Sequence, residues 1–61
     1  MKVRVVLKML QHDGWIHVKT TGSHRQFKHP VKNGKVTVAG KPSAELSVGT
    51  YLHILKQAGL R

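Results

Sequence analysis

Single glycine and proline residues divide this chain into short patterned stretches. Glycine adopts positive φ without penalty and proline lacks a backbone N–H, so each such position favours a turn or the end of an element. In chain order the interruptions are Asp13-Gly14, Thr21-Gly22-Ser23, Pro30, Asn33-Gly34, Gly40 and Gly59. No internal repeat is present, and a chain of 61 residues has room for only one thin core. We therefore predict a single domain over residues 1–61, too small to enclose a nucleotide cofactor.

The first stretch has the apolar spacing of an amphipathic helix. Its apolar positions i, i+3, i+4 and i+7 are Val3, Val6, Leu7 and Leu10. The stretch also alternates and contains three valines, which keeps a strand open as the alternative. Asp13-Gly14 favours the helix, because Gly14 suits the left-handed position past a helix end and Trp15 can supply the apolar contact of that cap. No Ser or Thr cap precedes this helix, where Lys2 and Val3 stand.

Three stretches of extended character follow. Trp15–Thr20 is rich in aromatic and β-branched residues, His24–His29 runs until a proline ends it, and Val36–Val38 is the third. Thr21-Gly22-Ser23 supplies a turn between the first two. Val31–Gly34 connects the next two and contains the Asn-Gly dipeptide favoured in tight hairpin turns. The predicted product is an antiparallel three-stranded meander.

A second helix is predicted after a loop over Gly40–Leu46. Thr50 or Ser47 is its expected N-cap, and Gly59 its C-terminal stop. Two faces fit the helical period: Val48, Leu52, Leu55 and Gly59, or Tyr51, Ile54, Leu55 and Ala58. The predicted fold class is α+β, with two helices packed on one face of a three-stranded antiparallel sheet in the order α-β-β-β-α.

The strong positive charge points to a polyanionic partner. Eleven Lys and Arg residues stand against two acids, giving a formal net charge of +9, so nucleic acid is the leading partner class. A peptide that lies on a membrane surface is the competing interpretation, but the basic residues are spread from Lys2 to Arg61. No run approaches the roughly 18 apolar residues of a membrane span. We expect a soluble cytoplasmic protein with no membrane partner.

Strand alternation predicts which side chains reach solvent. If Phe27, Val36 and Val38 face the helices, Arg25 and His29 share that side because alternate residues point to opposite faces. The open face then carries His24, Gln26, Lys28, Lys35 and Thr37. This face is either an ordinary solvated surface or a docking surface for a phosphate backbone.

The residue types permit RNA cleavage better than other chemistry. Asp13 and Glu45 are the only carboxylates, no thiol is present, and no histidine pair has the i, i+4 spacing of a helical zinc site. RNA carries its own nucleophile in the 2′-hydroxyl, so one imidazole with cationic neighbours can cleave it without a metal or cofactor. His12, His17 and His53 are expected to be surface or packing residues, and Trp15 and Tyr51 core or cap residues.

Short sequence blocks spread over nearly the whole chain match one known family. The blocks are Asp13-Gly14-Trp15, Gly22-Ser23-His24-Arg25-Gln26-Phe27-Lys28-His29-Pro30, Val36-Thr37-Val38, Gly49-Thr50 and Ile54-Leu55-Lys56-Gln57-Ala58-Gly59-Leu60. In these blocks the chain resembles the HicA-type toxins of HicA/HicB toxin-antitoxin systems. The resemblance implies a fold like a double-stranded-RNA-binding domain. It also implies cleavage of messenger RNA, arrest of translation, and a HicB antitoxin that binds the toxin and blocks its active face.

The resemblance maps the catalytic histidine of the Gly-Ser-His step onto His24. Many members carry a Pro and a His after the third strand, whereas this chain has Ala39–Pro42, so Lys41 or another residue must supply any second acid-base group. The expected RNA contacts are Ser23, Arg25, Gln26, Lys28, Lys35 and Lys41. We expect no metal and a monomeric free toxin. A non-catalytic RNA-binding module and a structural component of a ribonucleoprotein remain the alternatives.

Overall fold

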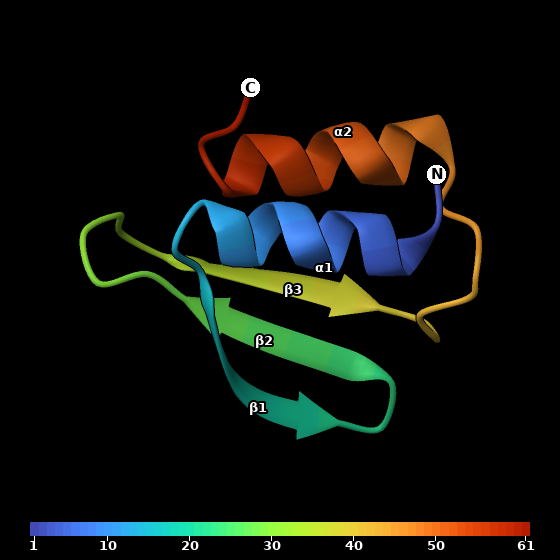
Figure 1. Cartoon of the computed structure of the whole chain (residues 1–61), viewed down its shortest axis with the longest axis horizontal. Helices are drawn as coiled ribbons and strands as arrows, with labels where there is room; N and C mark the ends of the chain where they lie inside the picture. Colours follow the sequence, from blue (N-terminus) through green and yellow to red (C-terminus); the bar gives the residue numbers. More distant parts are fainter.

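The computed structural model describes all 61 residues. Its elements are α1 (Val3–His12), β1 (Ile16–Thr21), β2 (His24–Lys28), β3 (Lys35–Ala39) and α2 (Val48–Gln57). The strands form one antiparallel sheet in the order β1-β2-β3. Figure 1 shows β1 at the sheet edge farthest from α2. The predicted element order and fold class are confirmed.

Both helices pack on the same face of the sheet. One core cluster joins α1, α2 and the sheet through Val3, Val6, Leu10, Trp15, Phe27, Val36, Val38, Ile54 and Ala58. Phe27 pairs with Val36, and Arg25 pairs with Val38, so the buried strand residues all lie on one side. Strand alternation therefore leaves the opposite side of the sheet uncovered, as predicted.

The first stretch forms a helix, and the alternative of a strand is wrong. Backbone groups of a distant loop replace the missing side-chain cap: the Val3 and Arg4 amides donate to the carbonyls of Ala44 and Pro42 at 2.9 and 3.0 Å. At its other end the Trp15 amide donates to the Leu10 carbonyl at 2.9 Å, with Gly14 at φ 98°. This is the predicted glycine cap with its apolar contact, and it places Trp15 in the core just before β1 rather than in the strand.

A two-residue turn joins β1 to β2 and brings Thr21 opposite His24. Gly22 has φ 59°, the positive value that the first central residue of a type II′ turn requires. The register shifts between His17 and Lys19, because His17 pairs with Phe27 while Lys19 pairs with Gln26. This β-bulge leaves Val18 as the extra residue and reverses the alternation of β1.

The connection from β2 to β3 is longer than a tight Asn-Gly hairpin. Lys28 pairs with Lys35, so residues 29–34 all lie in the loop. Asn33 does not have the positive φ that a type I′ turn needs, whereas Gly34 has φ 80°. Side-chain hydrogen bonds of His29 and Lys32 hold this loop in place. Local turn patterns in the sequence do not predict these bonds.

Ser47 is the N-cap of α2, since its Oγ accepts from the Thr50 amide at 3.2 Å. Of the two predicted faces, the second is confirmed: Ile54, Leu55 and Ala58 are buried and Tyr51 is half-buried. The first is wrong, because Val48 is 74% exposed. Neither helix is long and apolar enough to cross a bilayer.

Candidate active site

The open face of the sheet carries three cross-strand rows of side chains. His24, Gln26 and Lys28 alternate along β2 with inward-facing residues, and each stands between one residue of β1 and one of β3. The rows are Thr21, His24 and Ala39; Lys19, Gln26 and Thr37; and Ile16, Lys28 and Lys35. The predicted open-face residues therefore lie together on one surface, with His24 in the row at one end.

His24 stands at the start of β2, directly after the Gly22-Ser23 turn. Its side chain is exposed and makes no hydrogen bond within the protein. The Gly40 amide donates to the Ser23 carbonyl at 3.2 Å, which ties the chain leaving β3 to this turn. Ser23, His24 and the segment that leads into Lys41 are thus brought to the same end of the sheet.

Arg25 lies on the helix side of the sheet, not beside His24. Its Nη1 donates to the Gly40 carbonyl at 2.7 Å, and its side chain is half-buried. Together with the bond from Gly40 to Ser23, this contact fixes the backbone immediately before Lys41. Arg25 therefore contributes to the candidate site only indirectly, by holding the backbone of the segment that leads into Lys41.

The structure adds two residues to the site that sequence reasoning missed. Thr21 lies opposite His24, and Lys19 lies in the next row beside Gln26. Both reach the open face because of the bulge at Val18, and no hydrophobic period in the sequence signals that bulge. Lys28 and Lys35 lie four residues along the strands from the His24 row, about 13 Å away at the usual rise per residue.

Three of the other histidines form hydrogen bonds within the protein, and none of these three lies in the rows of the open face. His29 Nε2 donates to the Asp13 carbonyl at 2.7 Å, while its Nδ1 accepts from the amides of Val31 and Lys32, both at 3.0 Å. His17 Nε2 lies 2.6 Å from Thr20 Oγ1 on the helix side, and His53 bonds to Gln57. Among the five histidines, only His24 projects from the open face.

Both carboxylates of the protein are already paired elsewhere. Asp13 Oδ2 lies 2.5 Å from Lys32 Nζ, and that hydrogen bond lowers the pKa of Asp13 below its usual range. The N-terminal ammonium, at 2.9 Å, lowers the pKa of Glu45 in the same way, with help from Lys2. No set of three His, Asp or Glu side chains is close enough to hold a metal ion. The charged side chains in the rows of the open face are therefore all basic.

This arrangement can perform proton transfer next to a bound polyanion. The exposed imidazole has both ring nitrogens available, Lys19 lies in the neighbouring row of the open face, and the exposed Lys41 follows Gly40, whose amide bonds to Ser23. The same lysines are suited to stabilise negative charge that develops on phosphorus.

Comparison with known proteins identifies one matching family. No curated protein matches the chain. The family described as HicA toxin of bacterial toxin-antitoxin systems matches residues 3–60, from the first residue of α1 to the residue after the glycine cap of α2. The chain therefore belongs to the HicA toxin family, whose members are generally ribonucleases.

Proposed function

We propose that this protein is a toxin that cleaves messenger RNA, with His24 as the acid-base residue and without a metal. One observation carries the proposal: His24 stands exposed and unbonded on a basic face that contains no carboxylate. The membership in the HicA family supports the same conclusion. Cleavage of messenger RNA then arrests translation until an antitoxin covers the toxin.

The proposed reaction uses the nucleophile that RNA itself supplies. His24 takes the proton of a 2′-hydroxyl, the 2′-oxygen bonds to the adjacent phosphorus, and the bond from phosphorus to the 5′-oxygen breaks. Lys19 and Lys41 stabilise the extra negative charge on the phosphoryl oxygens. Lys41 is our candidate for protonating the leaving 5′-oxygen, because this chain has no histidine in the segment after β3. The products are a 2′,3′-cyclic phosphate and a 5′-hydroxyl.

The remaining open-face residues are proposed to bind the RNA backbone. Gln26, Lys28 and Lys35 continue from the His24 row toward the other end of the sheet, and Ser23 lies in the turn beside it. Trp15 and Phe27 pack in the core, so neither offers a ring for base stacking. Contacts of this kind read phosphate and ribose, and binding should weaken steeply as salt rises.

The second candidate function is a non-catalytic RNA-binding module. The basic open face suits binding equally well, and the altered segment Ala39–Pro42 is the specific feature that favours this alternative. Under this alternative His24 contributes only to the surface, so its removal leaves RNA affinity almost unchanged.

The deciding experiment is cleavage of an end-labelled single-stranded RNA by the purified protein in excess EDTA. We expect cleavage of RNA and none of an all-deoxy oligonucleotide, and a loss of about 10²-fold or more for His24→Ala. His53→Ala is the matched control, since His53 is exposed on α2 and bonds only to Gln57. Binding without cleavage would support the RNA-binding module. Cleavage by His24→Ala at the wild-type rate would refute the catalytic role.

A further inference from the structure

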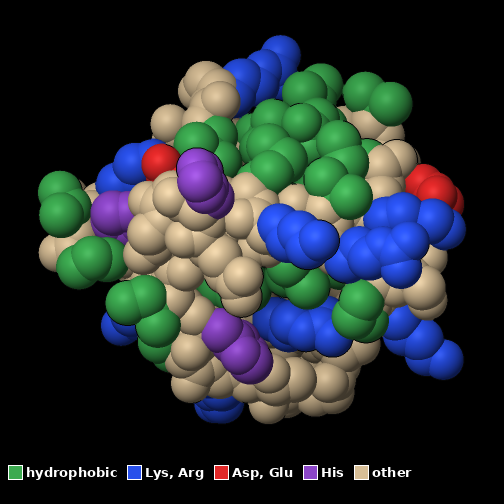
Figure 2. All heavy atoms as spheres, viewed as in Figure 1, with side chains coloured by type: hydrophobic (Ala, Val, Ile, Leu, Met, Phe, Trp, Pro, Cys, Tyr) green, Lys and Arg blue, Asp and Glu red, His purple; other side chains and the backbone are tan.

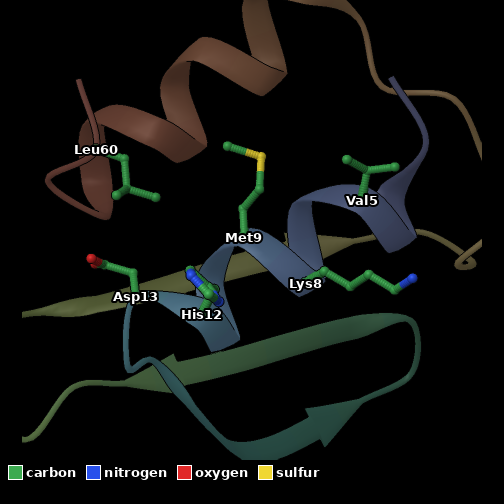
Figure 3. Close-up of a pocket in the computed structure, with 6 residues that line it drawn as sticks. All are labelled: Val5, Lys8, Met9, His12, Asp13 and Leu60. Atoms are coloured by element: carbon green, nitrogen blue, oxygen red, sulfur yellow. The ribbon is translucent and has the colours of Figure 1, made fainter.

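An apolar surface lies on the helical side of the protein, away from the open face of the sheet. Figure 2 shows hydrophobic side chains gathered around the two helices, with Lys and Arg side chains beside them. A groove within this surface runs between α1 and the chain that follows α2, lined by Val5, Lys8, Met9, His12, Asp13 and Leu60. In Figure 3 Met9 and Leu60 project into the same space, with Val5 along the helix from them.

The groove follows from a second stripe on α1. Val3, Val6 and Leu10 bury one side of this helix, whereas positions 5, 8, 9 and 12 repeat the helical spacing on another side. That stripe combines two apolar residues, Val5 and Met9, with Lys8 and His12. Val5 remains 39% exposed and Leu60 36% exposed. Contiguous apolar side chains left in water are typical of a surface that binds another protein.

Hydrogen bonds within the protein hold the walls of the groove in place. The Leu60 amide donates to the Leu55 carbonyl at 2.8 Å, and Gly59 with φ 69° completes this glycine cap of α2. Lys32 Nζ donates both to Asp13 Oδ2 and to the Ala58 carbonyl, at 2.5 and 2.9 Å. One lysine thus ties the ends of the two helices together, and a preformed groove loses little entropy on binding.

The charges at the groove favour an acidic partner. Asp13 is the only acid in the lining, and its carboxylate is occupied by Lys32. Lys8 is exposed on the rim and has no ion-pair partner, and the protein as a whole carries a net charge of +9. Apolar side chains between basic ones match a segment that alternates apolar and acidic residues.

We propose that this groove receives an acidic amphipathic segment of the antitoxin. Apolar side chains of the segment would lie among Val5, Met9 and Leu60, and its carboxylates would face Lys8 and His12. The proposal rests on the role of toxin stated above. It adds that the antitoxin is anchored on the side of the molecule opposite His24, because α1 covers one face of the sheet and His24 projects from the other.

The location has a consequence for inhibition. A segment held in the groove does not itself cover His24, so the part of the antitoxin that blocks RNA must reach the other face of the sheet. Groove contacts therefore set the affinity of the complex, while a separate contact stops the reaction. A variant with a damaged groove should keep its full RNA cleavage when alone and need more antitoxin for the same inhibition.

Charge substitution at Val5 tests the proposal. Binding of the purified cognate antitoxin is measured by calorimetry for wild type, Val5→Glu, Val5→Lys and Leu60→Glu, with thermal unfolding to confirm folding. We expect Val5→Glu and Leu60→Glu to raise Kd about tenfold or more, and Val5→Lys to raise it less because it keeps the attraction for carboxylates. Val31→Glu is the matched control, since Val31 is 83% exposed and lies outside the groove; its Kd should stay within about twofold of wild type.

Three outcomes would overturn the proposal. Wild-type affinity in Val5→Glu and Leu60→Glu would show that the groove is not the anchor. A greater loss in Val5→Lys than in Val5→Glu would exclude an acidic partner. Sedimentation of the free protein as a dimer that Val5→Glu dissociates would assign the groove to a second copy of this chain. RNA cleavage, measured in parallel on the free proteins, separates these results from a failure of the catalytic proposal, because groove binding does not depend on it.

Discussion

The histidine that begins β2 and the histidine that directly follows this strand have opposite surroundings. His29 uses both ring nitrogens, in three hydrogen bonds that join the end of α1 to the loop after β2. Its ring also meets that of Trp15 edge to face, with centroids 5.2 Å apart. His24 lies five residues earlier, exposed and without a hydrogen bond. The same side chain thus has a structural position at one end of the strand and a chemically available one at the other.

The contacts that stabilise this small protein and the side chain available for chemistry lie at opposite ends of β2. The end of the sheet near His29 is held by Lys32, which bonds both Asp13 and Ala58. The end near His24 is held only through backbone contacts and through Arg25 on the far side of the sheet. Because the stabilising contacts lie at the His29 end, the imidazole at the His24 end remains unbonded and exposed to solvent.

Alanine at each histidine gives the largest expected contrast. His29→Ala leaves the Asp13 carbonyl and the amides of Val31 and Lys32 without their partner, and we expect a loss of about 2–3 kcal/mol of unfolding free energy. In a domain of this size that lowers Tm by roughly 10–20 °C. His24→Ala should change stability by less than about 0.5 kcal/mol, as at other exposed sites, while it removes RNA cleavage.

Thermal unfolding by circular dichroism, with cleavage assayed well below each Tm, measures both effects. The contrast fails if His24→Ala destabilises the protein as much as His29→Ala does. It also fails if folded His29→Ala has lost cleavage while His24→Ala retains it.

Alanine substitution of one glycine near each histidine gives a smaller expected difference in stability between the two ends of β2. Gly14 and Gly22 both have positive φ, of 98° and 59°, so each Ala variant carries a backbone penalty of about 1–2 kcal/mol. A Cβ at Gly14 would also lie 2.8 Å from His29 Nε2, whereas a Cβ at Gly22 would meet nothing within 4 Å. We expect Gly14→Ala to cost about 1 kcal/mol more than Gly22→Ala, because the His29 ring must shift and weaken its bond to Asp13.

Urea unfolding of the two glycine variants gives this difference directly. Equal losses would mean that His29 moves aside freely. In that case the network around it would contribute less to stability than its three hydrogen bonds indicate.

The sequence predicts the local features of this contrast and misses the tertiary ones. Both glycine caps follow from local patterns, and the alternation of Phe27 with its neighbours placed His24 on the open face. The bulge at Val18, which brings Lys19 beside Gln26, has no local signature because it depends on pairing with β2. The same holds for Lys32, whose two partners lie 19 and 26 residues away in sequence. Contacts of that range arise only when the helices have packed.

The smallest expected effect is the pH dependence of the Lys32 contact. Because the Lys32 hydrogen bond lowers the pKa of Asp13 in the folded state, their interaction stabilises the protein above the unfolded-state pKa of about 3.9. That contribution is lost as the pH falls through the lower folded-state value. The stability difference between wild type and Lys32→Met should therefore be constant from pH 7 to about pH 5 and shrink below about pH 4.

Urea unfolding at pH 7, 5 and 3 measures this difference, with Lys28→Met as the control because Lys28 is exposed and pairs with no carboxylate. Glu45 also titrates in this range, but it pairs with the N-terminus and Lys2 in every variant, so its contribution cancels. A residual difference should persist at pH 3, since the bond from Lys32 to the Ala58 carbonyl does not titrate there. A difference as large at pH 3 as at pH 7 would assign the whole effect of Lys32 to that carbonyl and none to Asp13.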